Sequence, residues 1–497
     1  MEDGSANRHA RGWTIAVALV VLLVAFALRV NGLTAGGLHL DEGYSLIQSE
    51  RSVIDIFALN RFDANPPFYI LTLHLWRTLF GDGEWALKSL GMMAGVVGVA
   101  AIGLAARVRF GVTAGLAAAW FVALNAFHLQ QSQEIRGYSL LLAAVALADF
   151  AFVRWFETGS RRALFGFALA TFYAVNVHHF AWGFALVQMG SVLIRPRSEA
   201  QRRDIARVLL GVVVLSLPML ASFAIHLVVH QSQSWIPLRG LDGLLGVLGE
   251  IAGRDAFAVL AGLLALLGGV GAAFPKQRLA ALGSFVSPEL ETDRVRAVAV
   301  PALQLTLPVV LFVGSYLLFP MLLARYCVIT ILPLGVLVGA GAAALRPRLL
   351  LLIACAALLV LARGPIVAEY ANELRLADQQ RWSEIVRDEY REGDVVLYTD
   401  KYVFVPAIAL HPPEMHEYLM PRLEGRNVST VLEHYTVRTV RREPLRPGEF
   451  ERAWIVKRPN EPLDRVLRDP MLAGTRPRLI RRVRETEIYL FALPASR

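Results

Sequence analysis

The sequence is poor in charge and in cysteine. Only 18% of its 497 residues are charged while 55% are hydrophobic, and the mean hydropathy is +0.48. This composition excludes a soluble globular protein. The two cysteines, Cys327 and Cys355, both lie inside apolar runs. The polar carboxyl-terminal part therefore has no disulfide, and cysteine usage does not identify its compartment.

Long apolar runs recur from Trp13 to Ala362. A helix of roughly 17 to 25 apolar residues crosses a bilayer, and about eleven such runs predict a mainly α, polytopic membrane helical bundle. The first run is expected to be an uncleaved helix rather than a signal peptide. The predicted spans are 13–30, 86–106, 112–127, 138–155, 163–178, 181–194, 206–229, 255–274, 298–319, 325–345 and 349–363.

Beyond residue 363 the composition changes to a dense mixture of Arg, Glu, Asp and Pro. We therefore expect a transmembrane domain over 1–363 and a small soluble α/β domain over 364–497. Helical spacing over 381–391 and β-rich runs at 394–399, 453–456 and 487–493 indicate the elements of this tail.

The stretch 66–80 is ambiguous because it is short, begins with two prolines and carries His74 and Arg77. Treating it as a helix that lies in the outer interface places the basic loops together on one side of the membrane, as the positive-inside rule requires. The amino terminus is then cytoplasmic, whereas the first outer loop, 31–85, and the tail face outward. The net charge of +9 fits this orientation signal and does not indicate a nucleic-acid partner, because the basic residues are scattered between spans.

With this topology, polar residues beside the membrane gather on the outer side. Ionisable groups at membrane depth are costly and usually functional. The acids Asp41 and Glu42 are the catalytic candidates. The substrate-binding candidates are Tyr44, Asn65, Lys88, Gln133, Glu134, Arg136, Tyr138, His178, His179, Arg325 and Tyr326.

Each candidate also has an ordinary structural explanation. Adjacent acids in a loop are usually solvated surface, and Arg136 could pair with Glu134 or reach toward the interface. Adjacent side chains such as His178 and His179 diverge, and no further ligand spacing accompanies them, so we expect hydrogen bonding there instead of a metal site. The convergence on one face favours function.

Carboxylates that face the outer compartment can act as a general base or bind a sugar hydroxyl, and Lys or Arg near lipid headgroups can bind a phosphate. Nucleotide sugars are absent outside the cytoplasm, so an activated donor there would be carried on a lipid phosphate. This chemistry suggests glycosyl transfer from a polyprenyl phosphate.

Five motifs occur in the order expected for one family. They are LHLDEGYS at 38–45, NPPFYILTLHLW at 65–76, EWALKSLGMMAG at 84–95, QSQEIRGYSLLL at 131–142 and ARYCVITILP at 324–333. Together they resemble the GT-C superfamily of membrane glycosyltransferases, in the branch of the protein O-mannosyltransferases and the lipid A aminoarabinose transferases. The tail departs from the β-trefoil insertion of the eukaryotic enzymes, so a protein acceptor is not implied.

The resemblance implies an inverting glycosyltransferase of a bacterial inner membrane with a polyprenyl-phosphate-linked sugar donor. Its acceptor would be an envelope lipid, glycan or protein. Asp41 would deprotonate the acceptor hydroxyl, Glu42 would position the sugar or the acceptor, and Arg136, Lys88 and Arg325 are candidates for the leaving phosphate.

Two alternatives remain at this stage. Many spans with a few buried charges also suit a transporter or flippase for a lipid-linked sugar, although no internal repeat is evident. A glycan polymerase or ligase would use a lipid-diphosphate donor. No cofactor is firmly predicted, and a divalent cation is left open.

Overall fold

The structure is a computed structural model of the chain. It describes residues 2–59, 65–194, 198–230, 236–273, 294–411, 414–419, 446, 449–458, 472, 478–483 and 486–493. The chain forms two compact units. The bundle unit contains Met1–Leu33, Asp63–Thr72 and Trp76–Glu369, and the sheet unit contains Thr34–Phe62, Leu73–Leu75 and Tyr370–Arg497. The domain boundaries expected from composition stay predictions.

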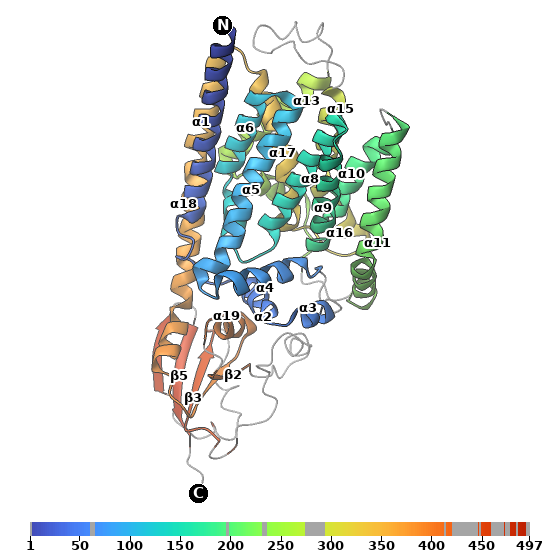
Figure 1. Cartoon of the computed structure of the whole chain (residues 1–497). Helices are drawn as coiled ribbons and strands as arrows, with labels where there is room; N and C mark the ends of the chain where they lie inside the picture. Colours follow the sequence, from blue (N-terminus) through green and yellow to red (C-terminus); the bar gives the residue numbers. More distant parts are fainter. Residues whose placement is uncertain are drawn as a thin grey trace. The chain divides into compact units, whose positions relative to one another are not determined.

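The bundle unit consists of helices, and each predicted span falls on one of them or on two consecutive ones (Figure 1). Among the described helices, seven are long and apolar enough to cross a membrane, or nine if each of two bent pairs counts as one span. The predicted polytopic helical fold is confirmed.

The described helices of the bundle unit are α1 (Glu2–Val30), α4 (Phe68–Phe80), α5 (Glu84–Phe110), α6 (Val112–Leu124), α7 (Ala126–Gln133), α8 (Tyr138–Thr158), α9 (Arg161–Val177), α10 (Ala181–Ile194), α11 (Glu199–His230), α12 (Leu241–Ile251), α13 (Asp255–Ala273), α15 (Arg294–Gln304), α16 (Leu307–Leu317), the 3-10 helix η3 (Ala324–Thr330), α17 (Ile331–Ala344) and α18 (Arg348–Glu389).

Some details differ from the expected spans. The span predicted at 112–127 bends by 62° between α6 and α7, and the loop expected before 255 contains α12, which is bent by 83° from α13. The span at 298–319 is divided between α15 and α16. The tail helix expected at 381–391 is the end of α18, a helix of 42 residues that runs on through Pro365. Hydropathy alone does not report such bends and continuations.

Helix α4 follows Pro66 and Pro67, as expected for the interfacial helix, and is not among the candidate spans. Figure 1 shows it lying across the ends of the bundle helices. Its first turns pack on this end of the bundle, where Phe68 meets Phe172 edge to face at 5.5 Å and the hydroxyls of Thr72 and Tyr173 are 2.7 Å apart. These contacts fix α4 against α9.

Close backbone approach holds the bundle centre together. Helix α17 is almost entirely buried, and a Cβ at Gly339 would collide with the backbone of Ala114 in α6. A Cβ at Gly341 would collide with the backbone of Leu264 in α13. Small residues allow this approach in membrane bundles, where dispersion replaces the hydrophobic effect between helices.

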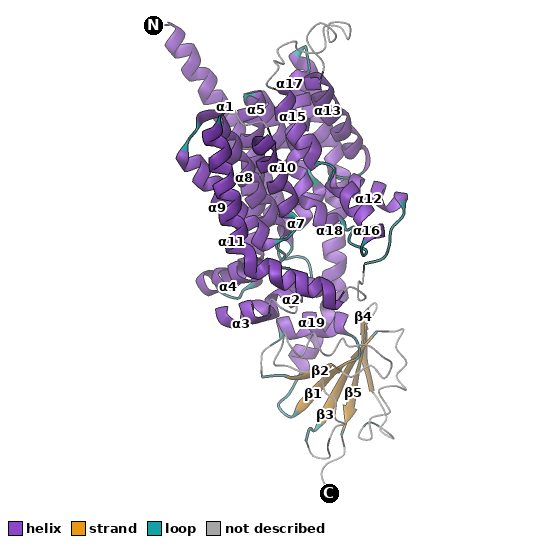
Figure 2. Ribbon diagram, turned by 90° about the vertical axis from the view of Figure 1, so that its right-hand side faces the viewer, coloured by secondary structure: helices purple, strands orange, loops and turns teal. Residues whose placement is uncertain are grey.

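The sheet unit contains a small five-stranded mixed sheet (Figure 2), which confirms the expected α/β tail. The strand order is β2-β1-β3-β5-β4, with β1 parallel to β2 and β3, and β5 antiparallel to β3 and β4. Strands β1, β3 and β5 match the predicted runs, whereas β2, β4 and α19 were not foreseen. The elements are α2 (Leu40–Ser49), α3 (Val53–Leu59), β1 (Asp394–Tyr398), α19 (Lys401–Leu410), β2 (His416–Leu419), β3 (Arg452–Lys457), β4 (Arg478–Val483) and β5 (Thr486–Ala492).

Candidate active site

The predicted acidic pair lies in the first turn of α2, in the sheet unit. His39 is the N-cap residue, and the side chain of Glu42 turns back so that Oε2 accepts the backbone N–H of His39 at 2.8 Å. This capping box satisfies a backbone donor that the start of a helix would leave without a partner. Glu42 is only 2% exposed. Its carboxylate is therefore part of the helix start.

Asp41 has different surroundings from Glu42. Leu40, Tyr44 and Ile47 lie on one face of α2 and pack into the hydrophobic core of the sheet unit. Successive residues of a helix point about 100° apart around its axis. Because Leu40 points into the core, Asp41 points away from the buried face of α2 and is partly exposed. The hydroxyl of Ser45 donates to the backbone carbonyl of Asp41, not to its carboxylate. The Asp41 side chain is therefore the accessible member of the pair.

Tyr44 stands one turn after Leu40 and is partly buried. Burial raises the pKa of its phenol, and the negative charge of Asp41 raises it further. Tyr44 therefore stays a neutral hydroxyl beside the acid at ordinary pH.

A second group of predicted residues meets in the bundle unit. The Tyr138 ring lies 6.2 Å from that of His178 and 6.4 Å from that of Tyr326, and the rings of His178 and Tyr326 are 5.3 Å apart. The guanidinium of Arg136 lies over Tyr138 at 5.6 Å. Phe180, which was not foreseen, completes the group at 5.0 Å from His178. We call these five residues the ring cluster.

The orientation of His178 is set by the backbone. Its Nδ1 accepts the N–H of Phe180 at 3.3 Å, which leaves the proton on Nε2 in the neutral ring. That Nε2 is buried and has no hydrogen-bond partner among the residues that the structure describes. The His179 ring instead contacts the Phe223 ring in a tilted arrangement, with centroids 4.1 Å apart. The two histidines therefore diverge, as expected for adjacent residues.

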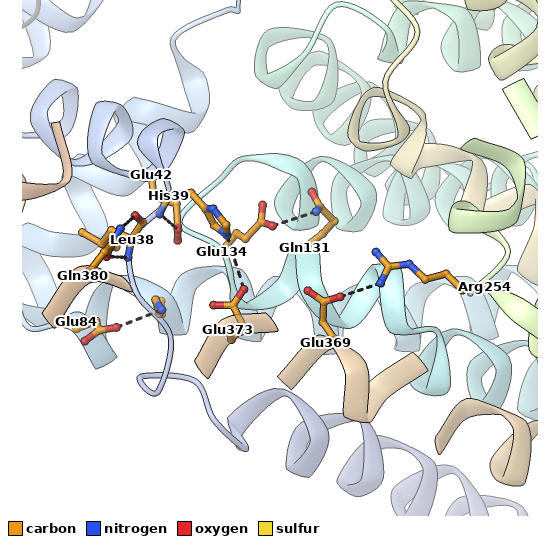
Figure 3. Close-up of polar contacts among 11 residues, drawn as sticks. Leu38, His39, Glu42, Glu84, Gln131, Glu134, Arg254, Glu369, Glu373 and Gln380 are labelled. Carbon is orange, nitrogen blue, oxygen red and sulfur yellow. Dashed lines mark hydrogen bonds and ion pairs between the residues drawn. The ribbon is translucent and has the colours of Figure 1, made fainter. Parts of the chain in front are cut away.

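The remaining candidates of the bundle unit take several positions (Figure 3). Lys88 is buried, and its Nζ lies 3.2 Å from a carboxylate oxygen of Glu84. The amide of Gln131 approaches Glu134 at 3.4 Å. Gln133 donates to the carbonyls of Arg29 and Asn31 and so satisfies acceptors at the end of α1. Gln133 therefore holds two helices together.

Asn65 and Arg325 stand at the starts of structured segments. Asn65 is half-buried and precedes the two prolines before α4. Arg325 lies in η3, directly before Tyr326 of the ring cluster.

Sequence reasoning missed a buried cation near the end of α1. Arg29 is fully buried, with its guanidinium 2.8 Å from Nδ1 of His128 and 3.2 Å from the hydroxyl of Ser132. An arginine inside an otherwise apolar span is a signal that could have identified it. Among the described residues, no group of three or more His, Cys, Asp or Glu side chains has an arrangement that could hold a metal.

Comparison with solved structures identifies a match over nearly the whole chain. ArnT from Cupriavidus metallidurans bound to undecaprenyl phosphate gives a TM-score of 0.65 at 16% identity, covering 97% of this chain and 98% of ArnT. The chain has the GT-C fold. The apo state of the same ArnT gives a TM-score of 0.61 with the same identity and coverage.

An oligosaccharyltransferase from Archaeoglobus fulgidus gives a TM-score of 0.47 at 13% identity, with 89% of this chain and 68% of that one covered. No protein-family model and no curated protein matches the sequence. The GT-C fold expected from the motifs is thus confirmed by structure, where sequence comparison finds no relative.

Proposed function

We propose that the protein is an inverting glycosyltransferase that moves a sugar from a polyprenyl-phosphate donor to a hydroxyl of an envelope lipid, glycan or protein. The observation that carries this proposal is the GT-C fold over the whole chain, shared with a protein that was crystallised with undecaprenyl phosphate. The division of roles in α2, where Glu42 caps the helix and Asp41 stays accessible, supports it.

In this reaction Asp41 takes the proton of the acceptor hydroxyl as general base. The hydroxyl oxygen then attacks the anomeric carbon from the face opposite the phosphate. The bond between that carbon and the phosphate oxygen breaks, and the lipid phosphate leaves with the electron pair. A single displacement of this kind inverts the anomeric centre.

The leaving phosphate gains negative charge as the bond breaks, so cations that contact it lower the barrier. Arg136, Arg325 and Lys88 are the proposed phosphate-binding cations. Arginine binds phosphate with two parallel hydrogen bonds, which favours Arg136 and Arg325. Lys88 lies beside Glu84, which offsets part of its charge. His178 adds an uncharged N–H in the ring cluster.

The Asp41→Asn variant tests the base. Turnover of a polyprenyl-phosphate-linked sugar, measured with purified protein, should fall by about 10² to 10⁴, the usual contribution of a general base. Asp55→Asn is the matched control, because Asp55 is exposed on α3 and its carboxylate accepts from Ser52. Full activity of the Asp41→Asn variant would overturn the assignment.

The same assay separates the alternative functions. Reconstituted protein that moves the labelled lipid-linked sugar across the bilayer without cleaving it is a flippase, and activity only with lipid-diphosphate donors indicates a polymerase or ligase. Transfer of the sugar from the lipid-monophosphate donor to an acceptor, giving a product with inverted anomeric configuration, supports the proposal.

A further inference from the structure

The backbone just before the acidic helix is held by a side chain from the other end of the sequence. The carboxamide of Gln380, in the last part of α18, accepts the N–H of Leu38 at 2.7 Å and donates to the carbonyl of the same residue. Gln380 thus pairs with both polar backbone groups of Leu38, as a neighbouring strand would (Figure 3). The two residues are 342 positions apart.

Neighbouring residues strengthen this attachment. A Cβ at Gly37 would collide with the Gln380 side chain, and one at Gly36 with that of Glu373. Nε2 of His39, the N-cap residue of α2, lies 3.8 Å from Glu373. The chain that enters α2 therefore lies against one face of α18, where Gly36 and Gly37 leave room for the Glu373 and Gln380 side chains.

Helix α2 itself is held against α19. A Cβ at Gly43 would lie 2.9 Å from Cγ1 and 3.1 Å from the carbonyl oxygen of Val405. Val405 is fully buried, and on α2 the side chains of Tyr44 and Ile47 enter the same core. The rotation of α2 about its own axis is thus set by contacts with the tail.

We propose that the carboxyl-terminal segment positions the catalytic acid, with Gln380 and the contact between Gly43 and Val405 as its positioning elements. This inference rests on the proposed function, in which Asp41 is the general base. The hydrogen bonds fix where α2 begins, and the glycine contact fixes how it is turned. Together they determine the direction of the Asp41 carboxylate.

Catalysis is sensitive to such positioning. A displacement of about 1 Å caused by a distant substitution can lower a rate by about 100-fold, because the reacting atoms leave their near-attack geometry. Binding of the donor phosphate by the bundle unit would be unaffected. The inference therefore predicts a loss in kcat with little change in the KM for the donor.

The first experiment replaces Gln380. The Gln380→Ala variant of the full chain should lose about 10- to 100-fold in kcat with an unchanged donor KM, and the amides of α2 should exchange hydrogen faster. Gln380→Glu keeps the acceptor for the Leu38 N–H but loses the donor, so its kcat should lie between those of the wild type and of Gln380→Ala. Glu384→Ala is the matched control, since Glu384 is exposed on the same helix.

The second experiment uses rescue across the contact. Gly43→Ala should lower kcat because its Cβ overlaps Val405, and the double variant with Val405→Ala should regain part of the loss, since only the Cγ1 overlap is relieved. A double variant no better than Gly43→Ala overturns the proposed contact.

The outcomes separate the two proposals. Faster exchange in α2 with unchanged kcat means that the attachment is only structural and overturns the positioning role, as does unchanged exchange with unchanged kcat. A fully active Asp41→Asn variant instead overturns the base assignment, whatever the exchange data show.

Discussion

Asp41 and Glu42 are adjacent in the chain, but their carboxylates have different surroundings. Glu42 is buried and accepts a backbone N–H, so its charge is already committed to the start of α2. Asp41 points away from the face of α2 that packs into the core and is partly exposed. The family resemblance assigned Asp41 as the base and Glu42 as a positioning residue, but it could not predict that Glu42 caps the helix, because this depends on which face of α2 is buried.

Substituting Glu42 tests this division. Glu42→Gln keeps an oxygen that can accept the His39 N–H, so sugar transfer should stay within a few-fold of the wild-type rate. Glu42→Ala loses the capping bond and should lower the stability of α2 by about 1 kcal/mol. Amide exchange of α2 measures this effect. A Glu42→Gln variant as inactive as Asp41→Asn would show that Glu42 takes part in the chemistry.

His178 provides a second test at the residue scale. His178→Phe keeps the ring in the cluster but removes the Nε2 donor, and His178→Gln restores an N–H. If His178 binds the donor, the first variant should raise the donor KM about tenfold, the value of one hydrogen bond to a charged group. The second should recover most of the affinity. Equal KM values for all three proteins would remove His178 from the binding site.

At the scale of elements, the bent helix pairs show what hydropathy could not predict. Asn125 separates α6 from α7, where its Oδ1 accepts the N–H of His128 and its Nδ2 donates to the carbonyl of Ile251 at the end of α12. Gly253, Arg254 and Asp255 then have φ angles of 104°, 70° and 50° before α13. Left-handed backbone at two residues other than glycine is costly and is kept only where the surroundings hold it.

Variants of Asn125 test this junction. Asn125→Ala loses both hydrogen bonds and leaves buried groups without partners, which should cost about 1 to 3 kcal/mol. Asn125→Ser keeps the N-cap oxygen of α7 but loses the bond to Ile251, so its loss should be smaller. Unfolding in detergent measures both. Equal stability of the Asn125→Ala variant and the wild type would contradict the role of this residue.

The sheet of the tail carries an acid-dependent contact. The Lys457 ammonium donates to Glu487 at 2.8 Å and holds the pKa of this carboxyl below its usual value of 4.5. A carboxyl whose pKa is lower in the folded state than in the unfolded state stabilises the fold at any pH above the unfolded-state pKa. This contribution is lost as the pH falls through the folded-state pKa. Glu487→Gln should therefore melt at a lower temperature than wild type near pH 7. The difference should shrink as the pH falls below 4.5 and through the lowered pKa of the folded state, and a constant difference would contradict the assignment.

For the whole molecule, local signals predicted more than long-range ones. Hydropathy and proline placement predicted the helical bundle and the start of helix α4 after Pro67, because both depend on short runs of sequence. Tyr138, His178 and Tyr326 were expected only to share one side of the membrane, and their contact joins three distant segments. The attachment of Leu38 to Gln380 and the fully buried Arg29 depend on contacts between distant segments. No periodicity within a window reports such contacts.

The orientation of the molecule in the membrane remains a prediction with a direct test. In a chain without Cys327 and Cys355, a single cysteine is placed at Glu414, exposed in the tail, or at Thr158, exposed at the opposite end of α8 from Tyr138. An impermeant thiol reagent should label the tail cysteine in intact spheroplasts, and the other only after permeabilisation. The reverse pattern would place Asp41 on the cytoplasmic side. Nucleotide sugars are available in the cytoplasm. The location of Asp41 would then no longer be a reason to expect a lipid-phosphate donor.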